Sequence, residues 1–89
     1  MIPLTLVQLR QKIAAIDASI IQKLAERQSL SQKIGQIKAD LNLKITDVKQ
    51  EAKQFATYVA LSNSYEISPI FICALFESIL LYSKQLQQS

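Results

Sequence analysis

The pattern of apolar and polar positions over residues 4–39 is that of one long amphipathic helix. Apolar residues recur every three or four positions, in the heptad spacing of a helix that packs against another helix. At about 1.5 Å per residue such a helix is roughly 50 Å long, whereas a compact chain of this size is about 25–30 Å across. We therefore expect its far half to pack outside its own monomer. The two seam positions hold Leu6, Ile13, Ile20, Arg27, Ile34 and Leu41, and Leu9, Ile16, Lys23, Leu30 and Ile37.

Two shorter helices are predicted after a looser stretch at residues 40–46. Thr46 or Asp47 is the expected N-cap of a second helix that runs to about Asn63. Ser68-Pro69 predicts the start of a third helix, which runs to about Gln87. We expect a single all-α domain over residues 1–89. The apolar stripes expected to pack are Val48, Ala52, Phe55 and Val59 on the second helix, and Ile72, Phe76 and Ile79 on the third.

Cationic side chains interrupt or flank the seam of the first helix. Arg27 stands where the heptad requires an apolar residue, which indicates either a structural ion pair that fixes helix register or a site for an anion. Lys38 lies close to three helical turns further on, so it either shares a ligand with Arg27 or is a solvated lysine at a helix end. Arg10 lies about 25 Å before Arg27 and reaches the same small ligand only from an antiparallel partner helix.

The other two helices carry polar pairs at helical spacing. Asp47 and Glu51 share a face near the start of the second helix, where they either compensate the helix dipole or point into a site. Ser83 and Gln87 continue the apolar stripe of the third helix, where they either fray into solvent or complete that site. Each pair is a weak signal, but together they predict polar groups on the inner face of all three helices.

Composition excludes several kinds of site. The 89 residues include no His and one Cys, Cys73, which rules out the usual zinc sites and the Ser-His and Cys-His nucleophile pairs. The net charge of +3 is spread among acidic residues, so nucleic acid is not an expected partner. The longest apolar run, residues 70–76, is too short to span a membrane, and no signal-peptide pattern opens the chain. We expect a cytoplasmic protein.

The ordered motifs of the chain resemble those of the all-helical chorismate mutases, over about residues 4–88. No single motif is specific, but the order and spacing of the set fit this family. The motifs are Leu9-Arg10-Gln11-Lys12-Ile13, Ile16-Asp17, Leu24-Ala25-Glu26-Arg27, Ile34-Gly35-Gln36-Ile37-Lys38, Asp47-Val48-Lys49-Gln50-Glu51-Ala52 and Phe76-Glu77-Ser78-Ile79.

The resemblance implies an intertwined homodimer of three-helix chains, with the long first helices antiparallel and two shared active sites. It also implies the pericyclic conversion of chorismate to prephenate in aromatic amino acid biosynthesis. This reaction needs no cofactor, metal or covalent intermediate. It requires the substrate in its compact conformer and stabilisation of the charge that develops at the breaking ether bond.

The roles that the resemblance implies can be assigned residue by residue. Arg10 of the partner and Arg27 would bind the two substrate carboxylates, with help from Ser83. Lys38 and Gln87 would donate to the ether oxygen. Asp47 and Glu51 would hold the ring hydroxyl. The expected catalytic residues are therefore Lys38, Gln87, Arg27 and Glu51, and the substrate-binding set adds Arg10, Asp47 and Ser83.

One position departs from the family pattern. The family usually has an arginine where this chain has Gln50, which removes a positive charge near the substrate carboxylates; Lys49 or Lys53 is a candidate replacement. Three alternatives stay open on the sequence alone. They are an isochorismate pyruvate-lyase of the same fold, an enzyme for an amino-substituted chorismate, and a catalytically silent helical module for dimerisation or regulation.

Overall fold

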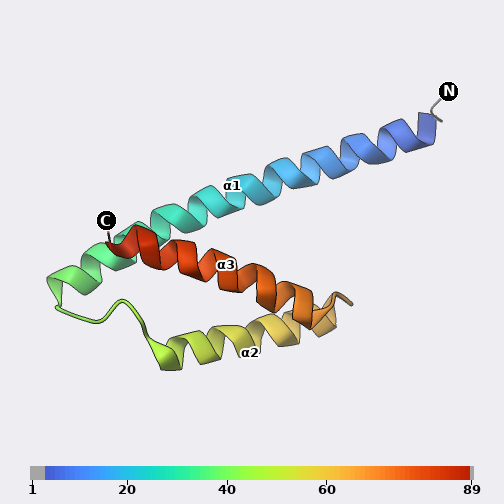
Figure 1. Ribbon diagram of the computed structural model, residues 1–89. Helices are drawn as coiled ribbons and strands as arrows, with labels where there is room; N and C mark the ends of the chain where they lie inside the picture. The colour runs from blue at the N-terminus through green and yellow to red at the C-terminus, as the bar shows by residue number, and fades with distance from the viewer. Residues whose placement is uncertain (1–3, 89) are drawn as a thin grey trace. The chain divides into compact units, whose positions relative to one another are not determined.

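The computed structural model describes residues 4–88, which form three α-helices with no β-strand among them (Figure 1). Helix α1 spans Leu4–Asp40, α2 spans Val48–Ser64 and α3 spans Pro69–Gln88. The all-α fold and the three helices predicted from the sequence are confirmed, with every boundary within one residue of its predicted position.

Local capping chemistry explains where α2 and α3 begin. The Asp47 side chain accepts a hydrogen bond from the backbone N–H of Gln50 at 3.1 Å, which makes Asp47 the N-cap of α2. The Ser68 hydroxyl accepts from the N–H of Phe71 at 3.3 Å, and Pro69 occupies the first helical position. These caps satisfy amide groups that a helix start leaves without a partner.

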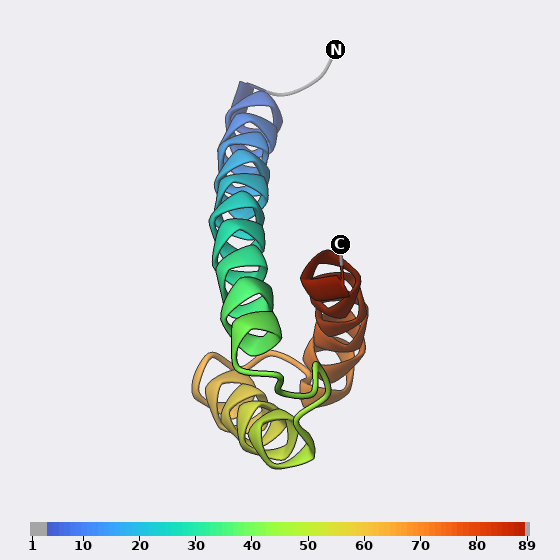
Figure 2. The ribbon, with the colours of Figure 1, turned by 90° about the vertical axis from the view of Figure 1, so that its left-hand side faces the viewer.

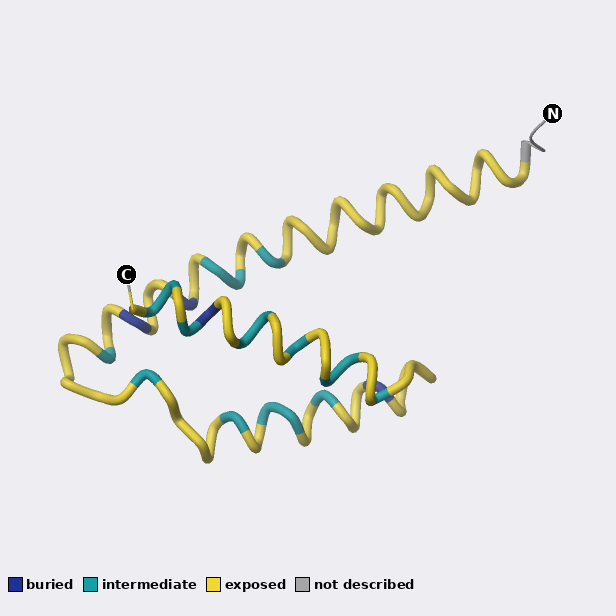
Figure 3. Tube along the Cα trace, viewed as in Figure 1, coloured by how far each residue is buried: buried dark blue, intermediate teal, exposed yellow. Residues whose placement is uncertain are grey.

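The chain divides into two compact units, with the division between Leu30 and Ser31. The first unit contains the part of α1 up to Leu30. Its apolar seam is exposed to solvent, and Ile13, Ile16 and Ile20 are each more than half exposed (Figure 3). A surface ion pair joins Lys23 to Glu26 at 3.1 Å. The first unit thus presents an apolar stripe without covering it.

In the second unit, α2 and α3 form an antiparallel helical hairpin (Figures 1 and 2). The turn between them includes Glu66, which has a left-handed backbone with φ of 57°. The rings of Tyr58 and Phe76 stack across the hairpin, with centroids 4.0 Å apart. This contact joins the two helices near the middle of their length.

The face of α2 that packs differs from the predicted stripe. Val48, Ala52 and Val59 are exposed, and only Phe55 of the predicted stripe is half-buried. The covered positions on α2 are Glu51, Gln54, Phe55, Tyr58 and Ser62. The predicted stripe was wrong because the side of α2 that faces α3 mixes polar residues with the aromatic residues Phe55 and Tyr58.

The predicted stripe of α3 is confirmed, since all of its members are at least half-buried: Ile72, Phe76, Ile79, Ser83 and Gln87. Small residues occupy the most deeply buried positions of the second unit. The buried side chains among the described residues are Ser31, Ser62 and Ser83, and none is apolar. The hydroxyls of Ser62 and Ser83 donate to the carbonyl oxygens of Tyr58 and Ile79, one turn earlier. The described chain therefore lacks an apolar core of its own.

Helix α3 is long and strongly apolar. By length and composition alone it could cross a membrane, with a mean hydropathy of 1.3 over its most apolar window. A helix that packs its apolar face against other helices passes the same test. Localisation therefore remains a prediction.

Candidate active site

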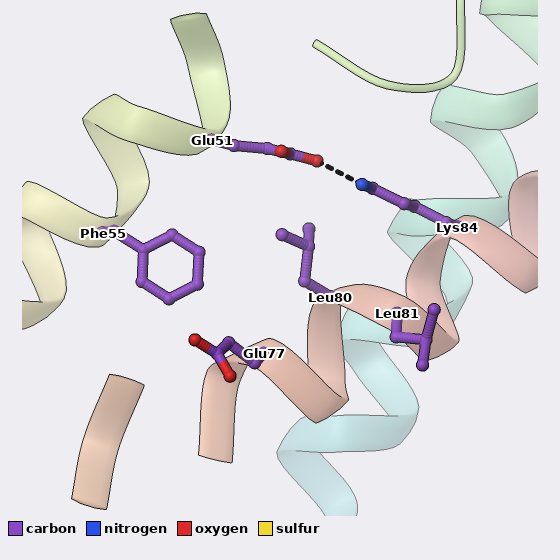
Figure 4. Close-up of a pocket in the computed structure, with 6 residues that line it drawn as sticks. All are labelled: Glu51, Phe55, Glu77, Leu80, Leu81 and Lys84. Carbon is purple, nitrogen blue, oxygen red and sulfur yellow. Dashed lines mark ion pairs between the residues drawn. The ribbon is translucent and has the colours of Figure 1, made fainter. Parts of the chain in front are cut away.

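A cleft of about 470 Å³ opens between α2 and α3. Figure 4 shows its lining, with apolar side chains in the middle and charged side chains at the edge. Its volume is in the range of sites that hold small molecules. The lining residues are Glu51, Phe55, Glu77, Leu80, Leu81 and Lys84.

An ion pair closes one end of this cleft. The ammonium group of Lys84 lies 2.6 Å from a carboxylate oxygen of Glu51, and each side chain is about one-quarter exposed (Figure 4). The capping at Asp47 fixes where α2 begins, so Glu51 lies one turn into α2 and faces α3. Glu51 is therefore a cleft residue rather than a solvated acid that only compensates the helix dipole.

Ser83 and Gln87 lie on the face of α3 that turns inward. Ser83 is buried, and Gln87 is half-buried with its side-chain oxygen Oε1 inaccessible to solvent. That oxygen has no hydrogen-bond partner among the described residues. A buried polar atom without a partner is costly and is typical of a position that a ligand or a missing group completes. The interpretation of these two residues as a frayed end is wrong.

The backbone of α3 approaches α1 at Gln87. Gly35 of α1 is buried, and a Cβ atom at this position would lie 2.6 Å from the Cα of Gln87. Only a residue without a side chain permits this approach, because real Cβ atoms do not come so close to backbone atoms. Gly35 thus sets the position of Gln87 beside the C-terminal part of α1.

Lys38 lies one turn further along α1 and is half-buried. Its ammonium group donates to the carbonyl oxygen of Ile45 at 2.8 Å, across the connection between α1 and α2. The backbone N–H of Leu43 donates to the carbonyl of Lys38 at 2.7 Å, and Asn42 adopts a left-handed backbone with φ of 55°. These contacts hold Lys38 in place and leave its other N–H donors available.

The remaining predicted residues lie apart from the cleft or in the first unit. Asp47 is exposed and caps α2, while Gln50, Lys49 and Lys53 are exposed on that helix. Arg10 and Arg27 belong to the first unit, where Arg10 is exposed and Arg27 is half-buried. Within the second unit, Glu51 therefore contacts the new residue Lys84 in the cleft. Ser83 and Gln87 do not line this cleft, and Lys38 lies one turn along α1 from the Gly35–Gln87 contact.

Comparison with known proteins identifies the family. The model of the family described as chorismate mutase type II matches residues 9–88. This chain belongs to the chorismate mutase type II family. The resemblance read from the ordered motifs is thereby confirmed.

Named relatives of the chain fall into two kinds. The bifunctional chorismate mutase/prephenate dehydratases of Buchnera aphidicola and Escherichia coli K12 are 35% identical over 71 residues and 29% identical over 84 residues. These matches cover 80% and 94% of this chain, but 18% and 22% of the relatives, so the chain spans about a fifth of their length. The chorismate mutase of Methanocaldococcus jannaschii is 28% identical over 83 residues, which are 93% of this chain and 84% of the relative.

For a member of the chorismate mutase type II family, the cleft has suitable chemistry. Among the described residues no cluster of His, Cys, Asp and Glu could hold a metal ion. The charged groups that line the cleft are the carboxylates of Glu51 and Glu77 and the ammonium group of Lys84, which bind a polar molecule through hydrogen bonds and charge. Such an arrangement suits binding and electrostatic stabilisation better than nucleophilic attack.

Sequence reasoning missed Lys84. The sequence did contain an indication of its role. Segment 69–88 has two charged residues, Glu77 and Lys84, among uncharged ones, and they lie seven positions apart. Seven positions are close to two helical turns, so the two side chains share one face of α3. That face is the one that lines the cleft.

Proposed function

We propose that this chain is a chorismate mutase that rearranges chorismate to prephenate for aromatic amino acid biosynthesis. The observation that carries the proposal is the family match over residues 9–88, which includes all seven predicted site residues. The match to the chorismate mutase of Methanocaldococcus jannaschii supports it further, because it covers most of both chains.

The chemistry of the second unit fits this reaction. A pericyclic rearrangement proceeds without a nucleophile, and its barrier falls when the reactive conformer is held and the developing charge is stabilised. Lys38 retains N–H donors beyond its bond to Ile45, and the half-buried Gln87 carries two N–H donors on its side-chain amide. We assign both residues to the ether oxygen of the substrate, and Glu51 to its ring hydroxyl.

Arginines supply the charge for the two substrate carboxylates. Arg27 interrupts the apolar seam of α1 and is half-buried, and Arg10 lies on the same helix. The guanidinium group binds a carboxylate through two parallel hydrogen bonds. In our proposal Arg27 acts within its own chain, Arg10 acts in the site of a second copy, and Ser83 assists one carboxylate.

The second copy is also the proposed cover for the apolar seam. No apolar side chain among the described residues is buried, and the apolar members of the heptad seam are exposed from Leu6 to Leu41. A heptad seam of this length fits another α-helix of the same pattern. We therefore propose an intertwined, antiparallel homodimer with two shared sites, located in the cytoplasm and independent of cofactors, metals, membranes and nucleic acid.

Turnover of chorismate by the purified chain tests the proposed activity. Because isomerisation leaves the mass unchanged, prephenate is identified by proton NMR, and the spontaneous rearrangement is subtracted. We expect the natural chain to turn over chorismate and Arg27→Ala to be inactive. Loss of activity in the variant, purified in the same way, also excludes a contaminating enzyme from the host. Absence of turnover, or release of pyruvate from isochorismate instead, would overturn the assignment.

The dimer is tested separately by sedimentation at micromolar concentration. The expected mass is about twice the 10.0 kDa of one chain. A folded monomer under these conditions would contradict both the dimer and the sharing of Arg10.

A further inference from the structure

We infer that Lys84 is a specificity-determining residue of the site: through its ion pair with Glu51 it offsets one of the two carboxylate charges of the cleft, and so weakens the repulsion of a dianionic substrate. This inference rests on the proposed function, because the substrate carries two carboxylates. It starts from the 2.6 Å ion pair between Lys84 and Glu51, which the sequence did not lead us to expect.

The charge balance of the cleft is the first argument. Three ionisable side chains line it, namely the carboxylates Glu51 and Glu77 and the ammonium group of Lys84. Without Lys84 the lining of the cleft would carry two negative charges and no positive one. Such a lining repels an anionic substrate, and the repulsion is strong where side chains are partly withdrawn from water.

The position of Lys84 on α3 is the second argument. Lys84 precedes Gln87 by three residues, so it is a neighbour of this predicted substrate-binding residue on the surface of the helix. Its partner Glu51 is the carboxylate assigned to the ring hydroxyl. The ion pair therefore connects the α2 and α3 parts of the proposed site (Figure 4).

The exposed lysines of α2 are poorer candidates for this role. Lys49 and Lys53 are both exposed and neither lines the cleft, whereas the side chain of Lys84 is only 26% exposed. A positive charge at the cleft acts on the substrate at short range, whereas one in solvent is screened within about 8–10 Å. Lys84 is thus a better candidate than Lys49 or Lys53 for the positive charge that Gln50 does not supply.

The test compares Lys84→Met, Lys84→Arg and the double variant Lys84→Met/Glu51→Gln with the natural chain. We expect Lys84→Met to raise KM for chorismate about 10-fold with a smaller change in kcat, which corresponds to unit charges about 10 Å apart at an effective dielectric constant of about 20. Lys84→Arg keeps the charge and should stay within about 2-fold of the natural KM. Lys44→Met removes an exposed lysine outside the cleft and should leave KM unchanged.

The double variant separates an electrostatic role from a structural one. If the uncompensated carboxylate is the cause, adding Glu51→Gln to Lys84→Met should lower KM again, although kcat falls with the loss of Glu51. An unchanged KM in Lys84→Met, or an equal change in Lys44→Met, would overturn the inference. If Lys84→Met fails to fold, Lys84→Gln replaces it; this variant keeps a polar side chain without the charge, and its KM should rise by the same factor.

A binding measurement keeps this inference distinct from the proposed function. The affinity of a cyclohexane dicarboxylate, which cannot react, is measured by calorimetry for the same variants. If the natural chain binds this probe but does not turn over chorismate, the proposed function fails. Weaker binding to Lys84→Met but not to Lys44→Met would then still support Lys84, and equal binding would refute it.

Discussion

Gly35 and Gln87 meet backbone to backbone, at a separation where a Cβ atom on residue 35 would lie 2.6 Å from the Cα of Gln87. This contact links α1 to the end of α3. It fixes the location of an amide that the proposed mechanism needs. A glycine inside a helix weakens that helix by about 1 kcal/mol relative to alanine, so its presence here has a packing reason.

Gly35→Ala should lower both stability and activity. The added methyl group must push the end of α3 away, and overpacking of this kind costs about 1–3 kcal/mol, partly offset by the gain in helix propensity. We expect a net loss of up to about 2 kcal/mol of folding stability, measured by thermal denaturation, and a fall in kcat because Gln87 moves. Gln32→Ala, at an exposed position of the same helix, should change neither. Full activity of Gly35→Ala would show that the contact does not position Gln87.

Lys38→Ala and Gln87→Ala should act mainly on the transition state. Both residues are assigned to an oxygen whose negative charge grows as the ether bond breaks, so kcat should fall about 10²–10³-fold while KM changes less. Since the Gln87 amide does not titrate, activity should persist across neutral pH. Steady-state kinetics check this, and an effect on KM alone would mean that these residues only bind the substrate.

Lys38 has a second role that this experiment must separate. Its bond to the carbonyl of Ile45 stabilises the connection before α2, so Lys38→Ala removes that bond as well. Lys38→Arg keeps a donor for Ile45 and a positive charge. If Lys38→Arg keeps the denaturation midpoint of the natural protein but has a lower kcat, then Lys38 acts in the reaction and not only in the stability of the connection.

Asp47 has an observed role as the N-cap of α2 and a predicted role at the substrate, and two substitutions distinguish them. Asp47→Asn keeps a good cap and removes the charge, whereas Asp47→Ala removes both and should cost about 1 kcal/mol of stability. If Asp47 binds the substrate as a charged acceptor, Asp47→Asn should raise KM at unchanged stability. If Asp47 only caps the helix, the kinetics of Asp47→Asn should match those of the natural chain.

Mixing two inactive variants tests the shared site. Arg10→Ala and Arg27→Ala should each be nearly inactive, because each removes a bidentate carboxylate contact. In a heterodimer of the two, one site carries both defects and the other carries neither, so mixing should restore part of the activity. Subunit exchange is verified with a size-tagged copy. No recovery after verified exchange would argue that both arginines act within one chain.

Gln50 is predicted to make the enzyme weaker than its relatives with arginine at this position. A hydrogen bond to a charged group contributes about 1.5–3 kcal/mol, so Gln50→Arg should raise kcat/KM by roughly 10- to 100-fold unless another cation already acts there. Lys49→Ala and Lys53→Ala serve as controls. If either lysine compensates, its removal should harm the natural chain more than the Gln50→Arg variant. An unchanged or lower kcat/KM in Gln50→Arg would mean that glutamine is not a defect.

The sequence predicted what depends on neighbouring residues and missed what depends on distant ones. The starts of α2 and α3 were predictable because Asp47, Ser68 and Pro69 carry their capping signals locally. The packed face of α2 was not, because Glu51 faces α3 through an ion pair with a residue 33 positions later. Hydrophobic periodicity contains no information about such a partner.

The site shows the same division. The stripe that ends in Ser83 and Gln87 was visible from helical spacing alone, and the structure shows its members at least half-buried, whereas the sequence left open whether the last two fray into solvent. The close approach of Gly35 to Gln87 was not, because a glycine in a helix has the same sequence signal whether or not another helix touches it. The proposed role of Arg10 depends on contacts with a second copy of the chain, and the spacing of residues along one helix contains no information about those contacts.

The described residues lack an apolar core, which has a consequence for stability if the proposed dimer forms. If the seam of α1 is covered by a second copy, folding and association are coupled. Most of the hydrophobic stabilisation of the folded chain then comes from association with the second copy. Dilution then acts as a denaturant. The concentration of the chain in the cell would then set the fraction that is folded, so a higher level of expression would stabilise the protein without any change in sequence.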